Sequence, residues 1–189
     1  MSSYKRIHIY GHVSAQPQAI AILFDAQLAS EIVAESDLAI FAINPAAGVD
    51  QKTIDQWQAL SDFQLPRLVV VNELDGSDAD FEDAIMLANR VFDQLVTPYL
   101  VLHSESGSPI ALISLSDLQI IDYSTSPPTT SASEIEHQEL VAEFRTEYLE
   151  QIAGAGDNAF AAGLLFPAIP IVISNGLGID VVKSFIDQL

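Results

Sequence analysis

Hydrophobic residues in the first half of the chain fall either into short continuous runs or at helical spacing. The continuous runs Leu38–Ile43 and Leu68–Val71 predict strands buried on both faces, and Lys5–Tyr10 predicts a first strand. Helical spacing predicts one or two helices over about 17–35 and one helix each over about 51–62 and 79–95. This alternation predicts an α/β fold with a doubly wound, mostly parallel sheet and helices on both faces.

The pattern changes after residue 97. Short strands are expected at Tyr99–His103, Ile110–Ser114 and Leu118–Ile121, joined by short turns, which predicts a small antiparallel unit. A Ser/Thr/Pro linker is expected over Ser124–Ser133, followed by a helix from the capping-box pair Ser133 and Glu136 to about Gly154. The last elements expected are a short helix over Asp157–Leu165, a strand over Ile169–Ser174 and a helix over Ile179–Leu189. The predicted division is therefore a core of residues 1–97 and 166–189 with an inserted subdomain of residues 98–165.

Composition narrows the function classes. There are 26 acidic against 7 basic residues in 189, giving a net charge of −19, which disfavours nucleic acid or an anionic membrane as a direct partner. The absence of cysteine excludes disulfides, thiol catalysis and cysteine-bound metals. Neither a signal peptide nor a membrane span is predicted, so a cytoplasmic protein is expected.

Polar residues follow two of the buried strands and are candidates for ligand binding. Asn72 and Asp75 leave the strand Leu68–Val71, where doubly wound sheets bind ligands. A carboxylate there accepts two coplanar hydrogen bonds, as the N1–H and 2-amino edge of guanine requires. Ser174 and Asn175 follow the last strand in the same way. For both sites, an ordinary turn leaving a strand is the alternative interpretation.

The loop after the first strand occupies the position of a phosphate-binding loop. Such a loop needs glycines, a lysine and a Ser or Thr for Mg²⁺. Residues Gly11–Gln18 hold one glycine, no lysine, and Pro17 where an N–H donor would be useful. His12 would have to lie near an attacking water to act as a base, and a structural role is the alternative.

No metal site or catalytic residue is predicted. The acidic residues near the start of the third helix lack the spacing of a calcium loop, and the helix dipole explains them as a solvated N-terminus. They are Asp75, Asp78, Asp80, Glu82 and Asp83.

Several motifs together resemble a known family. Asp37–Asp50 is similar to the pattern D-G-A-x-x-V-x-D-A-x-x-G-V, and Leu65–Asn72 is similar to V-P-R-x-x-x-x-N. Asn72–Asp75 then stands at N-K-x-D, followed by Asp78–Phe81 at G-A-D-F. These motifs resemble the G domain of translational GTPases of the elongation factor G type. The resemblance implies a P-loop NTPase-like fold, with the antiparallel strands as the subdomain that elongation factor G inserts.

Departures from the family pattern decide the expected function. Glu73 replaces the lysine of N-K-x-D, and Asn175 replaces the alanine after Ser174. Gly11-His12-Val13 aligns either with the phosphate loop G-H-V-D-H-G-K-T or with switch II, D-T-P-G-H-V, so only one of these motifs can be present. If GTP or GDP binding is retained, the resemblance places it on Gly11, His12, Asn72, Asp75, Ser174 and Asn175.

Three functions follow as hypotheses. The first is a pseudo-GTPase without hydrolysis, acting as an interaction or regulatory module with a basic or translation-related protein partner. The second is residual GTP or GDP binding. The third is an unrelated small enzyme, for which no nucleophile–base pair can be named. Missing outer strands would also expose a sheet edge, through which a homodimer is expected.

Overall fold

The computed structural model describes residues 4–76 and 80–189, so the predicted roles of Asp78 and Ala79 lie outside the described residues. The core is a six-stranded sheet in the order β2-β1-β3-β4-β10-β5, and every pair of neighbouring strands is parallel. The strands are β1 Ile7–Gly11, β2 Gln27–Leu28, β3 Leu38–Ile43, β4 Arg67–Val71, β5 Leu95–Val96 and β10 Phe166–Pro170. The α/β prediction is confirmed.

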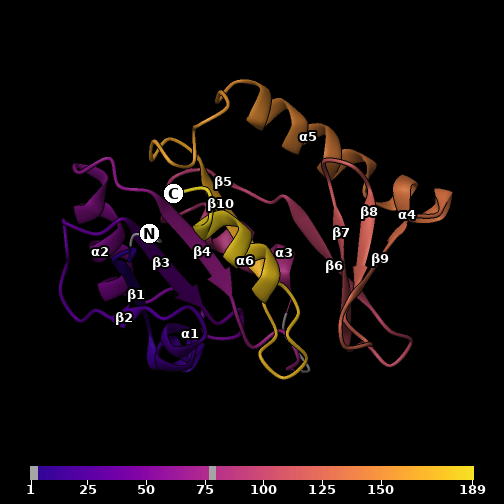
Figure 1. The fold of residues 1–189 in the computed structure, drawn as a ribbon, viewed down its shortest axis with the longest axis horizontal. Helices are drawn as coiled ribbons and strands as arrows, with labels where there is room; N and C mark the ends of the chain where they lie inside the picture. Colours follow the sequence, from indigo (N-terminus) through magenta and orange to yellow (C-terminus); the bar gives the residue numbers. More distant parts are fainter. Residues whose placement is uncertain (1–3, 77–79) are drawn as a thin grey trace.

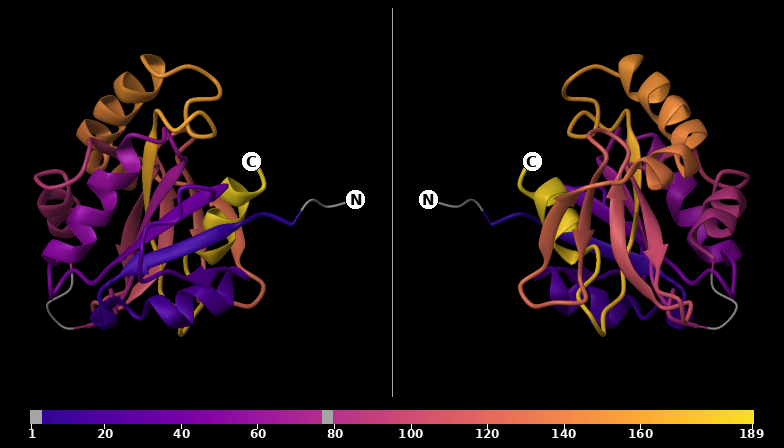
Figure 2. Two further views of the ribbon diagram at one scale, coloured as in Figure 1. Left: turned by 90° about the vertical axis from the view of Figure 1, so that its left-hand side faces the viewer. Right: turned by 90° about the vertical axis from the view of Figure 1, so that its right-hand side faces the viewer.

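Helices cover both faces of this sheet. Figure 2 shows α2 (Gln51–Ser61) and α3 (Phe81–Ala88) on one face, with α1 (Pro17–Leu23) and α6 (Ile179–Ile186) on the other. The six residues of β3 and the five of β4 are all buried, as expected for strands covered on both sides. A short 3₁₀ helix, Val13–Ala15, joins β1 to α1.

Two aromatic side chains of the core pack against a buried cation. Arg67, only 3% exposed, starts β4 and lies 4.2 Å from the Trp57 ring centre and 4.3 Å from that of Phe166. Its guanidinium donates to the Trp57 carbonyl at 3.0 Å and approaches the Asp93 carboxylate at 3.4 Å. Burial lowers the pKa of Arg67, while Asp93 opposes that effect. The cation therefore acts mainly as a packing and hydrogen-bonding element.

A second, antiparallel sheet lies beside the core. Its order is β6-β7-β8-β9, with β6 Tyr99–His103, β7 Pro109–Ser114, β8 Gln119–Asp122 and β9 Thr129–Ala132. It is followed by α4 (Ile135–Leu140) and α5 (Ala142–Ala153). In Figure 1, α5 runs along the top of the molecule, and Arg145 fixes it by donating to the Leu115 carbonyl at 3.0 Å. The antiparallel unit is confirmed.

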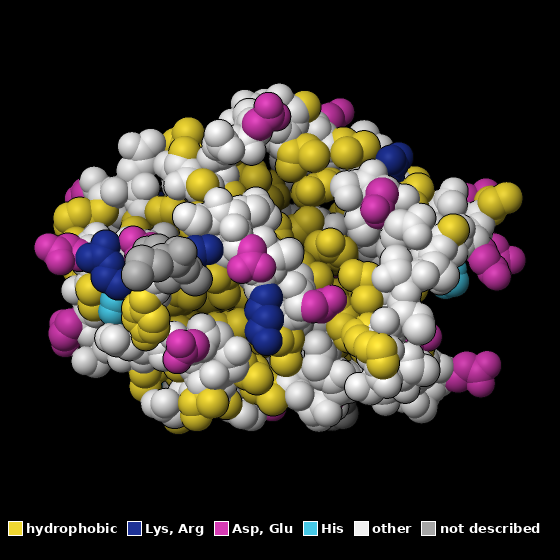
Figure 3. All heavy atoms as spheres, in the orientation of Figure 1, with side chains coloured by type: hydrophobic (Ala, Val, Ile, Leu, Met, Phe, Trp, Pro, Cys, Tyr) yellow, Lys and Arg dark blue, Asp and Glu magenta, His cyan; other side chains and the backbone are white. Residues whose placement is uncertain are grey.

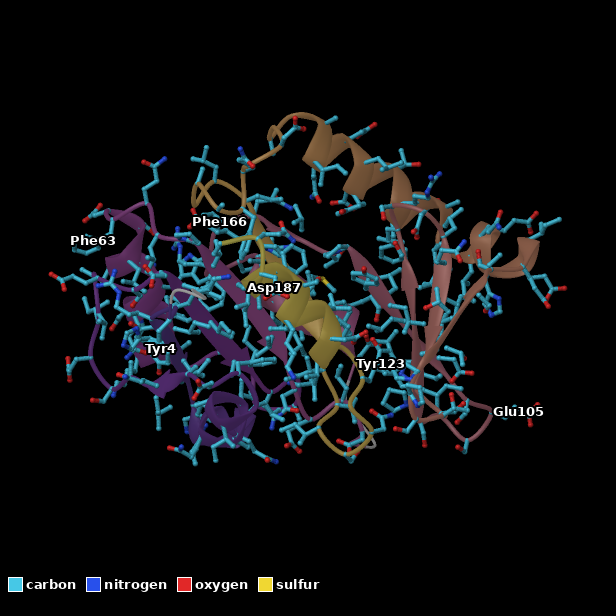
Figure 4. The ribbon with its side chains drawn as sticks, viewed as in Figure 1. Tyr4, Phe63, Glu105, Tyr123, Phe166 and Asp187 are labelled. Atoms are coloured by element: carbon cyan, nitrogen blue, oxygen red, sulfur yellow. The ribbon has the colours of Figure 1, made fainter. Side chains whose placement is uncertain are left out.

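One hydrogen bond connects the antiparallel unit to the helices of the core. The hydroxyl of Tyr123, labelled in Figure 4, donates to the Asp180 carboxylate on α6 at 2.5 Å. Burial raises the pKa of this Tyr123 hydroxyl, and the neighbouring Asp180 carboxylate raises it further. The phenol therefore stays protonated and remains a donor.

The predicted helix over 17–35 is wrong beyond Leu23. Ile20 and Phe24 are buried as expected, but the backbone of Asp25 adopts φ 50° and ends the helix. Leu28 then enters β2 and is 48% exposed, and Ile32 is 43% exposed. Their helical spacing was coincidental.

Other boundaries also differ from the prediction. The helix predicted to reach residue 95 ends at Ala88, and β5 follows it, because the Asn89 side chain caps the turn by accepting from Leu95 N–H at 2.8 Å. The predicted linker contains β9, which pairs with β8. Asp157–Leu165 forms turns instead of a helix.

Two further expectations are corrected at the ends of helices and strands. Ser133 does not cap a helix, because α4 begins after Glu134 without a side-chain cap. Ser133 instead accepts from Gln138 Nε2 through its carbonyl at 3.0 Å. The last strand is Phe166–Pro170, which lies earlier than predicted.

Candidate functional site

The predicted site residues lie along one edge of the core sheet. Because β1, β3, β4 and β10 are parallel, the loops that follow them meet at their carboxyl ends, along the lower edge of the sheet in Figure 1. We call the loop Gly11–Gln18 the phosphate end. We call residues 72–75 and 174–178 the base end. Both names refer to the family resemblance.

Two asparagines hold the phosphate end in place. Asn72, 2% exposed and directly after β4, donates through Nδ2 to the Ala15 carbonyl at 3.0 Å. Asn44, directly after β3, donates in the same way to the Ser14 carbonyl at 2.9 Å. The expectation that Asn72 ties neighbouring loops together is confirmed. The role of Asn44 was not predicted, although its position directly after a buried strand was the available signal.

Three backbone N–H groups of the phosphate end, those of Ser14, Ala15 and Gln16, are used within the loop itself. Ala15 N–H donates to the His12 carbonyl and Gln16 N–H to the Val13 carbonyl, both at 3.0 Å. Ser14 N–H donates to Nδ1 of His12 at 3.2 Å. Pro17 has no N–H. His12 therefore supports the local fold of the loop, as its alternative interpretation stated.

Gly11 allows the phosphate end to leave β1 close to its neighbour. Its φ is 150°, and a Cβ at this position would lie 2.6 Å from the Ala42 carbonyl oxygen of β3. This glycine is therefore required by the approach of two strands. The presence of glycine at position 11 is therefore explained without a bound phosphate.

A carboxylate contacts the phosphate end. Glu73, which replaces the lysine of the family motif, accepts a hydrogen bond from Nε2 of Gln16. Glu73 has φ 64°, and Gln16 has φ 54°, so both backbones are in the left-handed region. A carboxylate thus contacts the loop at Gln16, where the family motif places a lysine.

At the base end, the structure brings Asp75 and Ser174 together. The hydroxyl of Ser174 donates to the Asp75 carboxylate at 3.5 Å, and Asp75 is exposed. Asn175 turns away and donates to the Pro109 carbonyl of β7 at 3.0 Å, while its Oδ1 accepts from Leu177 N–H. Asn175 therefore fixes the loop to the antiparallel sheet, which sequence reasoning had not indicated.

Acidic groups dominate the surroundings of this edge. Asp80 caps α3 by accepting from Glu82 N–H at 2.9 Å, and Glu82 packs nearby. Burial raises the pKa of Glu82 to about 7, helped by its hydrogen bond to Asp80, whose own pKa is lowered. Figure 3 shows Asp and Glu side chains spread over the visible face. Among residues 4–76 and 80–189, no group of three or more His, Asp or Glu side chains is placed to hold a metal ion.

No protein-family model matches the chain. The elongation factor G-like protein of Mycobacterium tuberculosis is 29% identical over 167 residues, covering 76% of this chain. The mitochondrial ribosome-releasing factor 2 of Drosophila melanogaster is 26% identical over 129 residues, covering 64% of this chain. This chain is related to proteins of the elongation factor G type. It corresponds to 23% and 17% of the lengths of these two relatives.

A solved structure supports the same fold. A crystal structure of a protein from Thermus thermophilus superposes with a TM-score of 0.72 over 97% of this chain and 40% of that chain, at 16% identity. The likeness shows that the α/β core and the antiparallel sheet recur together, in the same arrangement, in that protein. In the described part of the chain, no helix combines the length and apolar character needed to cross a membrane.

Proposed function

We propose that this protein is an elongation factor G-like protein that does not hydrolyse GTP and that acts as an interaction or regulatory module. The proposal keeps the division into a core of residues 1–97 and 166–189 and an inserted subdomain of residues 98–165. Its partner is a protein, basic or translation-related. Neither nucleic acid nor a membrane is proposed as a direct partner.

The observation that carries the proposal is the state of the phosphate end. The N–H groups of Ser14, Ala15 and Gln16 already have acceptors within the loop, and Glu73 presents a carboxylate to Gln16. Phosphoryl transfer requires positive charge and Mg²⁺ around the terminal phosphate, each contributing several kcal/mol. The Glu73 carboxylate beside the loop and the hydrogen-bonded N–H groups of Ser14, Ala15 and Gln16 support the absence of GTP hydrolysis.

Isothermal titration of the full chain with GTP and GDP, with and without Mg²⁺, tests the proposal. We expect no heat of binding for wild type. The variant Glu73→Lys restores the lysine of the N-K-x-D motif, and Glu73→Gln is its matched control without a charge. We expect Glu73→Lys to remain unable to bind GTP, because the amides of Ala15 and Gln16 stay bonded. Micromolar, Mg²⁺-dependent GTP binding by wild type would contradict the proposal.

The translation-related partner is tested separately. Two relatives carry the names elongation factor G-like protein and ribosome-releasing factor 2, which favours a ribosomal partner. With a net charge of −19, binding would involve basic protein surfaces and would weaken as salt screens the charges. We expect the protein to co-sediment with ribosomes at low salt and to dissociate as salt rises. Failure to co-sediment under any salt condition would exclude this partner.

Residual GTP or GDP binding is the second candidate. The contact between Asp75 and Ser174 and the anchoring by Asn72 favour it, since the family resemblance assigns guanine recognition to these residues. A thermal shift with GDP that disappears in Asp75→Asn would support this function. A shift that survives Asp75→Asn would show that Asp75 does not read the base.

A further inference from the structure

The two edges of the core sheet differ in how they are covered. At one edge, β5 is buried, with Leu95 2% and Val96 4% exposed, and α5 packs against it. At the other edge, both residues of β2 are exposed. Within residues 4–76 and 80–189, β1 is the strand that pairs with β2, and no strand pairs with its outer side. Figure 1 shows β2 at the edge of the sheet beside α1.

The outer side of β2 presents free backbone groups. Ala29 N–H donates to the Ile9 carbonyl at 2.9 Å, so Ala29 faces β1. Because backbone groups alternate along a strand, the N–H and C=O of Leu28 face away from β1. An outward-facing N–H and C=O on an edge strand can pair with another strand.

An apolar groove lies next to these groups. A cavity of about 610 Å³ opens between α1 and β2, and its apolar wall includes Val13, Pro17, Ile22 and Leu28. Val13 is 78%, Ile22 74% and Leu28 48% exposed. Lys52 is the one charged residue in the lining. Apolar side chains gathered at an unpaired edge mark an interaction surface.

Charge decides between the possible occupants. A basic partner would be attracted to the 26 acidic residues of the chain, and no acidic residue among 4–76 and 80–189 lines this groove. A second copy carries the same net charge of −19 and can approach closely only through a face without carboxylates. Among the described residues, the lining of this groove holds no carboxylate, and the exposed Asp25 lies beside it next to Ile22. An isologous contact would also bury the same apolar residues from both copies.

We propose that β2 and the α1–β2 groove form the interface of a homodimer, in which the β2 strands of two copies pair antiparallel about a two-fold axis. The outward N–H and C=O of Leu28 pair across the axis, and Ile22 and Val13 of each copy cover the partner's groove. This inference is independent of whether the protein binds a nucleotide.

Salt dependence gives this dimer a distinctive signature. Two copies of charge −19 repel each other, and salt screens this repulsion. The dimer is therefore strengthened by salt. The basic partner of the proposed function is weakened by salt, so the two proposals fail separately.

Sedimentation velocity over a concentration series, at low and high salt, tests the dimer on the full chain. We expect a dimer whose Kd falls as salt rises. In the double variant Ile22→Glu and Leu28→Glu, buried carboxylates face each other, and we expect Kd to rise more than about tenfold. The matched control is Ile135→Glu with Leu164→Glu, which changes two residues that are 71% and 60% exposed elsewhere. We expect it to dimerise like wild type.

Amide hydrogen exchange locates the interface at single residues. The Leu28 amide is expected to become more protected as protein concentration rises, because it gains an acceptor in the dimer. The Ala29 amide, which is bonded to Ile9 within one copy, serves as the internal control. A wild type that is monomeric at every concentration and salt overturns the proposal. A dimer that persists in the Ile22→Glu, Leu28→Glu variant, or leaves Leu28 exchange unchanged, also overturns it.

Discussion

The phosphate end and the base end lie on the same sheet edge but differ in which residues of the family motifs they retain. The base end keeps Asn72, Asp75 and Ser174, with Asp75 and Ser174 in contact. The phosphate end keeps its place after β1, but the N–H groups of Ser14, Ala15 and Gln16 are bonded internally and the Glu73 carboxylate contacts Gln16. Asn44 and Asn72 hold the phosphate end, and Asn175 ties the base end to β7. The contacts that build this edge are therefore separable from those that would hold a phosphate.

The helices that follow the two ends differ in how their N-termini are capped. α1 begins after Gln16 with no side-chain cap and no acidic residue in its first turn. α3, after the base end, is capped by Asp80 and carries Glu82 and Asp83 in its first turn. Carboxylates near an N-terminus satisfy the helix dipole locally. The acidic start of α3 is thus explained by the helix itself, as the sequence indicated.

The largest expected effect is at the base end. Gly178 has φ 78°, and a Cβ there would lie 1.9 Å from the Pro170 carbonyl oxygen. We expect Gly178→Ala to lower the free energy of unfolding by about 3 kcal/mol or more, since backbone must move. Gly176, at φ 79° with open space around it, is the matched control, and Gly176→Ala should cost about 1 kcal/mol. Urea denaturation followed by the fluorescence of Trp57 measures both, and equal losses would contradict this explanation.

An intermediate effect is expected where the two ends meet. Asn72→Ala leaves the buried Ala15 carbonyl without its donor, and we expect a loss of about 2 kcal/mol in the free energy of unfolding. Asn44→Ala removes the bond to Ser14 at a partly exposed position, so water replaces it and the loss should be about 1 kcal/mol. The same denaturation experiment compares them. If both variants are as stable as wild type, the asparagines do not hold the phosphate end.

The smallest effect concerns the start of α3. The pKa of Glu82 is raised from 4.5 to about 7, so the native state retains a proton that the unfolded state releases first. This contribution to stability is fully present below pH 4.5 and is lost as pH rises through about 7. We expect Glu82→Gln, relative to wild type, to gain about 1 kcal/mol of stability between pH 4.5 and 8, after allowing for solvent screening.

Thermal denaturation at pH 4.5 and pH 8 measures this gain. Glu136→Gln removes an exposed carboxyl from α4 and controls for the change in net charge. A difference between Glu82→Gln and wild type that is the same at both pH values would show that Glu82 does not titrate as described.

Sequence patterns predicted the buried strands well because their signal is local. Leu38–Ile43 was predicted with its observed bounds, and Leu68–Val71 missed only Arg67 at its start. Arg67 was missed because a lone cation in a core is stable only when aromatic faces and an acceptor surround it, and those come from Trp57, Phe166 and Asp93. β2 and β5, each two residues long, carry no pattern of their own.

The candidate site was also predicted only in part from the sequence. Its position at the carboxyl ends of the strands followed from the order of elements and the family resemblance. The hydrogen bonds of Asn44 to Ser14 and of Glu73 to Gln16 join residues 30 and 57 positions apart, which no local pattern reports. Asn175 was expected near the ligand site but bonds to Pro109, because β7 lies beside its loop only in the folded chain.

The amino-acid sequence by itself determined the alternation of strands and helices, the acidic charge and the relationship to elongation factor G-type proteins, because these depend on residue type and on spacing along the chain. The tertiary structure decided which amides of the loop after β1 are free, which sheet edge is bare, and which carboxyl keeps a proton. These properties depend on groups brought together from distant segments, and burial and hydrogen bonding act only once those groups are in contact.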